Sequence, residues 1–143
     1  MHGQLDNPAK GQVPVSGALL AMPRHEALGV AEIPGKGRGL VACAELVRGQ
    51  LLEVAPVIPM TFSDGTERSS VLFNYPFAWE AEPYVEAIAL GAISMCNHSA
   101  TANAWFEPDL ANKVIRLFAA RRIAAGEEIT IDYGPDLWFE AEQ

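Results

Sequence analysis

The sequence predicts one small, mostly β domain. Its 143 residues fit a single compact domain and leave no room for two. Half of the residues are hydrophobic, so the chain can bury a core without disulfides or a structural metal. The apolar residues fall in stretches of about three to six residues, which is the length of a strand rather than of a helix.

Eight strands are expected, each bounded by residues that favour turns. They are Leu28–Ile33, Gly39–Cys43, Leu51–Pro56, Val71–Phe73, Ile88–Leu90, Ala104–Glu107, Val114–Ala119 and Glu128–Ile131. Two helical segments are also expected. One covers Pro83–Ala89, where Tyr84, Ala87 and Ile88 would share a face, and the other is a single turn at Ala92–Cys96.

The two ends of the chain differ from its middle. Residues 1–25 mix Gly, Pro, Gln and Asn with little periodicity, and they are predicted to form a flexible arm or one short edge element. The domain itself is expected over residues 26–134. Residues 135–143 are expected to form a separate aromatic tail.

Charge and hydropathy exclude several classes of partner. The chain has 18 Asp and Glu against 10 Lys and Arg, which gives a formal net charge of −8. An acidic surface repels phosphate, so no direct binding of nucleic acid is expected, whereas a basic peptide or protein would be attracted. No apolar run approaches the roughly 18 residues of a membrane span, and Ala18–Met22 is too short for the core of a secretory signal. No membrane association is therefore expected.

The cysteine content predicts a reducing compartment. Cys43 and Cys96 are too few for a disulfide framework or a four-cysteine zinc site. Both are expected to be free, buried thiols, and the expected location is cytoplasmic.

A glycine-rich segment, Gly35-Lys36-Gly37-Arg38-Gly39, lies between two expected strands. Glycines at alternate positions leave backbone groups exposed and let a ligand approach the chain closely. The alternative is an ordinary hairpin turn. A dinucleotide-binding loop is excluded, because no helical pattern follows the last glycine.

A polar cluster, Asn97-His98-Ser99 with Asn103, precedes the strand that begins at Ala104. Amides and a ring nitrogen at this point can bind a ligand, or they can brace a loop by capping backbone groups. A metal site is a poor interpretation, because Cys96 and His98 lack two further ligands at a usable spacing.

The third segment, Gly126–Gly134, reads as a turn, a short strand and then Tyr133. A tyrosine at the end of a strand most often packs with its hydroxyl in water. It becomes a candidate for catalysis only where a pocket forms around it.

The three segments, in this order, resemble those of the SET-domain protein lysine methyltransferases. The matching stretches are Lys36–Ala42, Asn97-His98-Ser99 with Asn103-Ala104, and Gly126–Tyr133. The resemblance covers about Leu28 to Gly134, and three motifs in order are far more specific than any one of them. The resemblance implies a fold of short strands in small sheets, with few short helices and a C-terminal segment that threads beneath a loop in a knot-like way.

The resemblance also implies an activity and a site. Family members transfer methyl groups from S-adenosylmethionine to the side-chain amine of a protein lysine. By this resemblance Asn97 would bind the methionyl end of the cofactor, the main chain of His98 would meet the adenine, and Tyr133 would be the catalytic residue at the inner end of the lysine channel. The implied cofactor-binding residues are Lys36, Gly37, Arg38, Gly39, Asn97, His98, Tyr133 and Trp138, and the implied channel residues are Ile131, Tyr133 and Phe139.

Several positions depart from the family pattern. Ala100 and Ala102 stand where Cys and Pro are common, and no cysteine follows position 96, so neither a zinc-binding C-terminal module nor another metal site is expected. The tail residues Trp138 and Phe139 would cover the adenine and wall the channel, or they would only seal the core. Ile131 replaces an aromatic residue that limits the number of methyl groups in many members, which leaves that number open.

Residues 61–86 are the segment in which target selection is expected. Its aromatic residues could wall a groove while carboxylates attract a basic peptide; the alternative is a strand face with core aromatics and a solvated acidic rim. The aromatics are Phe73, Tyr75, Phe77, Trp79 and Tyr84, and the carboxylates are Asp64, Glu67, Glu80, Glu82 and Glu86.

Two functions of different class follow from the sequence. The first is a methyltransferase that acts on a lysine-bearing basic protein or peptide. The alternative is a catalytically inactive SET-like module that binds a basic peptide or partner protein. A homodimer could form through edge strands.

Overall fold

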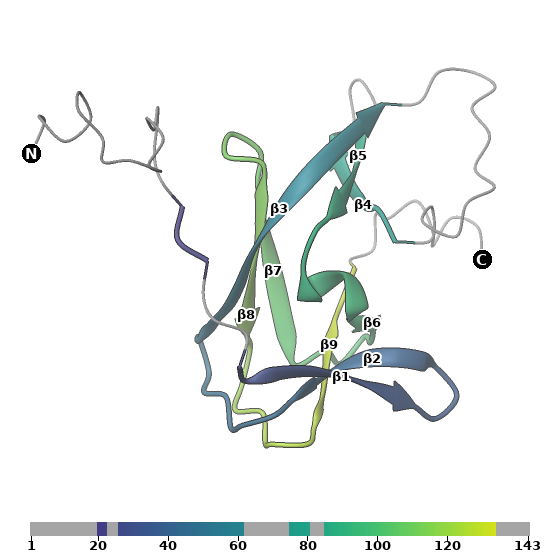
Figure 1. The fold of residues 1–143 in the computed structure, drawn as a ribbon, viewed down its shortest axis with the longest axis vertical. Coiled ribbons are helices and arrows are strands. Elements are labelled where there is room, and N and C mark those ends of the chain that lie inside the picture. The colour runs from purple at the N-terminus through teal and green to yellow at the C-terminus, as the bar shows by residue number, and fades with distance from the viewer. Residues whose placement is uncertain (1–19, 23–25, 62–74, 81–84, 134–143) are drawn as a thin grey trace, which may run out of the picture.

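The computed structural model describes residues 20–22, 26–61, 75–80 and 85–133, and it confirms the mostly β class (Figure 1). The elements, in chain order, are β1 (Leu28–Ile33), β2 (Gly37–Ala42), β3 (Leu51–Thr61), β4 (Phe77–Glu80), β5 (Val85–Ala89), the 3-10 helix η2 (Ala92–Met95), β6 (Asn97–His98), β7 (Ala104–Asp109), β8 (Val114–Ala119) and β9 (Glu128–Ile131).

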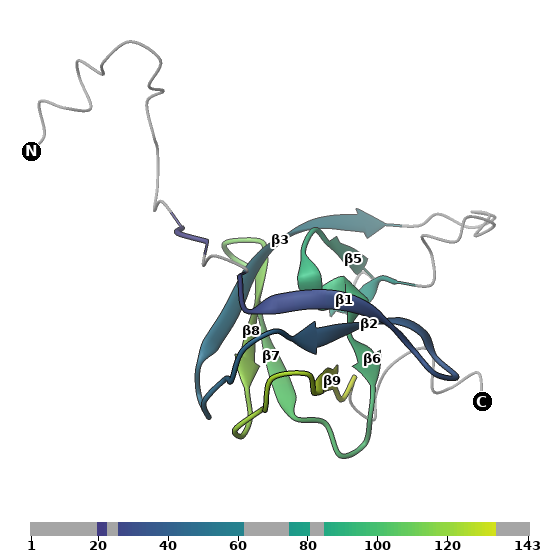
Figure 2. The ribbon, with the colours of Figure 1, turned by 60° about the horizontal axis from the view of Figure 1, so that its bottom comes forward.

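The strands form two sheets. The smaller has the order β1-β2-β9-β6, and the larger has the order β4-β5-β3-β8-β7. Figure 2 shows β1 and β2 side by side across the front of the molecule, with β9 below β2 in that view. Among the described residues no helix is long and apolar enough to cross a bilayer.

One hydrophobic core joins the two sheets. Leu40 and Ile129 of the smaller sheet and Ile115 and Leu117 of the larger are each at most 1% exposed and belong to one buried cluster. Ile93 of η2 is fully buried in the same cluster. Side-chain packing therefore holds η2 against both sheets.

The glycine-rich segment forms the turn between β1 and β2. Lys36 N donates to Ile33 O at 2.9 Å, and Gly35 and Gly37 adopt φ values of 79° and 80°. That left-handed conformation is costly for a residue with a Cβ, which explains the two glycines. The hairpin interpretation is thus confirmed for the backbone.

Strand β9 lies inside its sheet rather than at an edge. It pairs antiparallel with β2 through Leu40 and Ile129, and parallel with β6 through Asn97 and Thr130. The chain near residue 130 therefore lies between two strands that come earlier in the sequence, β2 and β6, as a threaded C-terminal segment requires. The passage beneath a loop stays a prediction, because residues 134–143 lie outside the described residues.

The helix expected over Pro83–Ala89 is wrong where the structure describes it. Val85–Ala89 is strand β5, paired with β3 on one side and with β4 on the other. Alanine and glutamate favour a helix locally, but pairing on both edges and burial override that preference. The single turn expected at Ala92–Cys96 is confirmed as η2.

The expected strands differ from the observed ones mainly in their bounds. Leu28–Ile33, Val114–Ala119 and Glu128–Ile131 agree, whereas β3 continues past the expected Pro56 to Thr61. Strands β4 and β6 are not predicted from the sequence. The first has four residues and the second has two, which is too short for an alternation of apolar and polar residues to indicate a strand. The strand expected at Val71–Phe73, most of the arm 1–25 and the tail 135–143 lie outside the described residues.

Candidate active site

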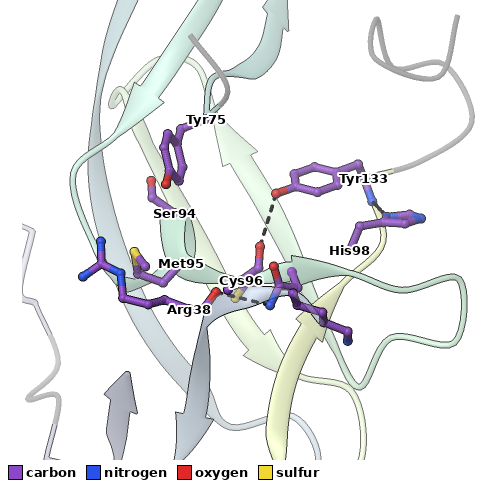
Figure 3. Close-up of a pocket in the computed structure, with 10 residues that line it drawn as sticks. Arg38, Tyr75, Ser94, Met95, Cys96, His98 and Tyr133 are labelled. Carbon is purple, nitrogen blue, oxygen red and sulfur yellow. Dashed lines mark hydrogen bonds between the residues drawn. The ribbon is translucent and has the colours of Figure 1, made fainter. Parts of the chain in front are cut away.

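A pocket of about 380 Å³ opens where the glycine turn, η2, β6 and the residues after β9 meet (Figure 3). Its lining residues come from segments far apart in the sequence. They are Lys36, Gly37, Arg38, Tyr75, Ser94, Met95, Cys96, Asn97, His98 and Tyr133. The fold thus brings all three sequence motifs to one cavity.

Tyr133 reaches this pocket with its hydroxyl. The hydroxyl donates a hydrogen bond to the Cys96 carbonyl at 3.3 Å, and the backbone N–H of Tyr133 donates to His98 Nδ1 at 3.2 Å (Figure 3). The rings of His98 and Tyr133 are stacked with centroids 5.6 Å apart, and the Phe77 ring lies 5.7 Å from Tyr133. The phenol therefore packs against two rings while its hydroxyl contacts the pocket residue Cys96.

The pKa of Tyr133 is raised to about 12, first by burial of the phenol and then by its neighbours Cys96 and Tyr75. Burial disfavours the charged phenolate because the surrounding medium solvates it poorly. At neutral pH the hydroxyl is therefore protonated. It can both donate and accept a hydrogen bond.

Asn97 ties the three motifs together. Its Nδ2 donates to Glu128 Oε2 at 2.8 Å and to the Arg38 carbonyl at 3.4 Å. A Cβ at Gly39 would lie 2.8 Å from Asn97 Nδ2 and 2.9 Å from Glu128 Oε2, which is closer than real Cβ contacts. Gly39 therefore permits the close approach of β2 to Asn97, although it is not among the residues that line the pocket.

Lys36 is not simply solvated. Its Nζ forms an ion pair with Glu128 Oε1 at 3.0 Å, with side chains that are 42% and 18% exposed. Glu128 thus bridges the glycine turn and Asn97, a role that the sequence did not reveal because its partners are distant along the chain. Arg38 lines the pocket and contributes its carbonyl to Asn97.

Asn103 braces the loop rather than the pocket. It is 3% exposed; its Nδ2 donates to the Glu128 carbonyl at 2.8 Å, and its Oδ1 accepts from Thr130 N at 2.9 Å. The bracing alternative therefore describes Asn103. Asn97 and His98 instead line the cavity.

The thiols differ from the expectation that both are buried. Cys43 is exposed and Cys96 is buried, and both are free. Cys43 follows the last residue of β2, where its backbone N–H bonds to Ala27 while the side chain keeps contact with water. The pKa of Cys96 is raised well above its usual range, first by burial and then by Glu53 and Glu128, so the thiol stays protonated.

Three lining residues were not predicted from the sequence as site residues: Ser94, Met95 and Cys96, whereas Tyr75 is one of the aromatics that could wall a groove. These three belong to η2 or follow it directly. Cys96 contributes its backbone carbonyl to the pocket, and neither Ser94 nor Met95 belongs to a recognisable sequence motif. A buried carboxylate, Glu53, holds the start of η2 and was also missed.

Apart from the tyrosine after β9, the predicted channel and tail residues are not among the described residues that line the pocket. Ile131 is fully buried in the core cluster and is not among the lining residues, so its channel role stays a prediction. Trp138 and Phe139 lie outside the described residues. In the segment 61–86, Glu86 is only 1% exposed, so it does not belong to a solvated acidic rim; it is buried in β5, a strand that is paired on both edges.

Within residues 20–22, 26–61, 75–80 and 85–133, no group of three or more His, Cys, Asp or Glu side chains is placed to hold a metal ion. Asn97, Lys36 and the carbonyls of Arg38 and Cys96 offer instead the mixed donors and acceptors that suit an organic ligand with polar ends.

Comparison with known proteins agrees with this geometry. The sequence model of the SET domain matches residues 37–134. A relative from Schizosaccharomyces pombe, named histone-lysine N-methyltransferase, H3 lysine-37 specific, is 31% identical over 117 residues, which cover 80% of this chain and 78% of the relative. A relative from Yarrowia lipolytica, named histone-lysine N-methyltransferase, H3 lysine-36 specific, is 30% identical over 122 residues, or 79% of this chain and 16% of that protein.

Two solved structures share the fold. A candidate histone methyltransferase of Plasmodium falciparum superimposes with a TM-score of 0.61 at 23% identity, over 79% of this chain and 96% of that one. The Neurospora SET domain protein DIM-5, a histone lysine methyltransferase, superimposes with a TM-score of 0.57 at 21% identity, over 76% of this chain and 52% of that one.

Proposed function

Because the chain belongs to the SET-domain family, we propose that it transfers a methyl group from S-adenosylmethionine to the side-chain amine of lysine in a basic protein. Family membership and the named relatives identify the enzyme class, a protein-lysine methyltransferase. The proposal concerns the donor, the acceptor and the residues that serve them.

One observation carries the proposal. The hydroxyl of Tyr133, the carbonyl of Cys96, the amide of Asn97 and the glycine turn all border the same cavity. Two oxygens therefore meet at one point of a pocket whose other wall is a backbone turn. This is the arrangement needed to hold a donor on one side and an amine on the other.

The residues present fit the donor. Lys36, Gly37, Arg38, Asn97 and His98, which line the pocket, would hold S-adenosylmethionine, and exposed backbone groups of the turn would bind its polar ends. Lys36 lies where it could meet a carboxylate, but that contact would compete with its present ion pair to Glu128. Bound there, the donor supplies a methyl group on a positively charged sulfur.

The acceptor must be a neutral amine. A free lysine side chain has a pKa of about 10.4, so it loses a proton before it attacks, and a dry pocket beside a positive charge favours that loss. Held by Asn97 and the glycine turn, the donor would supply its methyl group to this neutral amine and would be left as a thioether. Tyr133 is too weak an acid to ionise at neutral pH, so we assign it to orienting the amine by hydrogen bonds rather than to acting as a charged base.

The proposed acceptor is a lysine in a basic segment such as a histone tail. The formal charge of −8 favours a basic partner, and the relatives named above are specific for lysines of histone H3. We also propose that the chain forms a homodimer, for which the edge strand β1 with its half-exposed Val30 offers a surface. We further propose a reducing, cytoplasmic location, which the free thiols support.

The test combines binding and turnover. The chain would be titrated with S-adenosylhomocysteine by calorimetry and then incubated with labelled S-adenosylmethionine and histone H3 tail peptides, with Lys→Arg peptides as the control. Label on the lysine peptides alone supports the proposal. Binding without label transfer supports the inactive module instead, and absence of binding overturns the cofactor assignment.

A further inference from the structure

A carboxylate deep in the larger sheet contacts the turn that forms one pocket wall. Glu53 of β3 is 0% exposed. Its Oε2 accepts a hydrogen bond from Ala92 N at 2.5 Å, and its Oε1 accepts one from Ile93 N at 2.8 Å. Both oxygens are therefore committed to the first two residues of η2.

These bonds replace a cap that the local sequence lacks. The first N–H groups of a helix have no partner inside the helix, and a side chain at the preceding position usually accepts from them. Here that position is Gly91, which has no side chain to offer. A Cβ on Gly91 would collide with the Glu53 carboxylate, so the glycine also makes room for the distant cap.

A chain of hydrogen bonds links the Glu53 carboxylate to the hydroxyl of Tyr133. Ile93, whose N–H is held by Glu53, accepts through its carbonyl from Cys96 N at 3.0 Å. The carbonyl of Cys96 in turn accepts from the Tyr133 hydroxyl at 3.3 Å. Ser94, Met95, Cys96 and Asn97, which line the pocket, form one continuous stretch directly after the anchored residues.

We propose that Glu53 is a positioning residue for methyl transfer: by anchoring Ala92 and Ile93 it fixes the Cys96 carbonyl and Asn97 relative to Tyr133. This inference rests on the proposed function for its kinetic consequence. A buried carboxylate with two short bonds holds a backbone stiffly, and small displacements of reacting groups are costly to rate.

The first variant is Glu53→Gln. Its amide can accept one of the two N–H bonds, but it turns an NH2 group toward the other. We expect kcat with an H3 tail peptide to fall by about tenfold to a hundredfold, with a change of less than about threefold in KM for S-adenosylmethionine. The amide resonances of Cys96 and Asn97 should shift in the variant.

The matched control is Val114→Ala. Val114 is buried on β8, opposite Pro56 and Asp109 at the hairpin end of the sheet, so its truncation should lower stability at a residue that is paired with neither Glu53 nor η2. We expect a lower Tm with unchanged kcat and unchanged Cys96 and Asn97 resonances. A loss of kcat equal to that of Glu53→Gln would show that stability alone explains the effect and would overturn the proposal.

A second measurement covers failure to fold. If Glu53→Gln does not fold, Gly91→Ala, which presses a methyl group on the same carboxylate, should produce the resonance shifts; unchanged resonances overturn the proposal. If the wild-type chain shows no turnover, the proposed function fails. The resonance shifts then decide the role of Glu53 on their own.

Discussion

The hydroxyl of Tyr133 and the backbone carbonyl of Cys96 are joined by a 3.3 Å hydrogen bond across the pocket. One partner follows β9 and the other precedes β6, and these two strands pair in parallel. The parallel pairing sets the distance between the two oxygens, so the inner end of the pocket depends on backbone register as much as on side chains.

Tyr133→Phe should remove this bond while keeping the ring contacts with His98 and Phe77. We expect turnover to fall on the order of 100-fold, because the amine loses its orienting hydroxyl. Calorimetry should show nearly unchanged affinity for S-adenosylhomocysteine. Turnover equal to that of the wild type in a radiolabelled assay would reject the catalytic role.

Asn97→Ala should weaken cofactor binding and lower stability. The substitution leaves Glu128 Oε2 and the Arg38 carbonyl without their amide partner, at a cost of about 1.5–3 kcal/mol for a bond to a charged group. Urea unfolding and calorimetry would measure the two losses. Asn112→Ala, which removes an exposed bond to Asp109, is the control and should leave cofactor affinity unaffected.

The ion pair between Lys36 and Glu128 should contribute little to stability. Since Lys36 is 42% exposed, we expect a double-mutant cycle to give a coupling of about 0.2–1 kcal/mol that shrinks at high salt. Cofactor affinity should respond more strongly to Glu128→Gln than to Lys36→Met, because only Glu128 also holds Asn97. Equal responses would contradict that order.

Alkaline pH should destabilise the wild type more than Tyr133→Phe. The pKa of Tyr133 is raised from 10.0 to about 12 in the folded chain, so between these values the folded state binds more protons than the unfolded state. Stability from this group is complete below pH 10 and is lost as pH rises toward 12. Urea unfolding of both proteins at pH 9 and pH 11 measures the free energy of unfolding of the wild type relative to that of Tyr133→Phe, which should fall as pH rises; an unchanged relative stability would contradict the raised pKa.

Removal of residues 134–143 tests the sequence-based prediction for the tail. If Trp138 and Phe139 cover the adenine and wall the channel, the shortened chain should lose affinity for S-adenosylhomocysteine. Trp138→Ala and Phe139→Ala separate the two contributions. Retained affinity measured by calorimetry would leave only the sealing role.

The sequence predicted the β-rich class, the family and the three motifs that form the pocket. It misassigned Val85–Ala89 because Tyr84, Ala87 and Ile88 are spaced to share one helical face, while the pairing with β3 and β4 is a long-range contact that no local window contains. It found Asn97 and Tyr133 because three motifs in the same order as in the SET-domain family contain them.

The rest of the site could not be found in the same way. Ser94 and Met95 belong to a short apolar turn, and Cys96 serves the pocket with a backbone oxygen that every residue type has. Glu53 lies within an apolar strand, and only the fold reveals that Ala92 and Ile93 are its partners.

The position of β9 between β2 and β6 also constrains how the protein is made. Leu40 and Ile129 pair across most of the chain, so a nascent chain that has not yet emerged past residue 131 presents two unfilled strand edges. Contacts of such long sequence separation slow folding. Ribosome-bound intermediates of this protein would therefore have to be kept from pairing with each other until β9 has been synthesised and lies between β2 and β6.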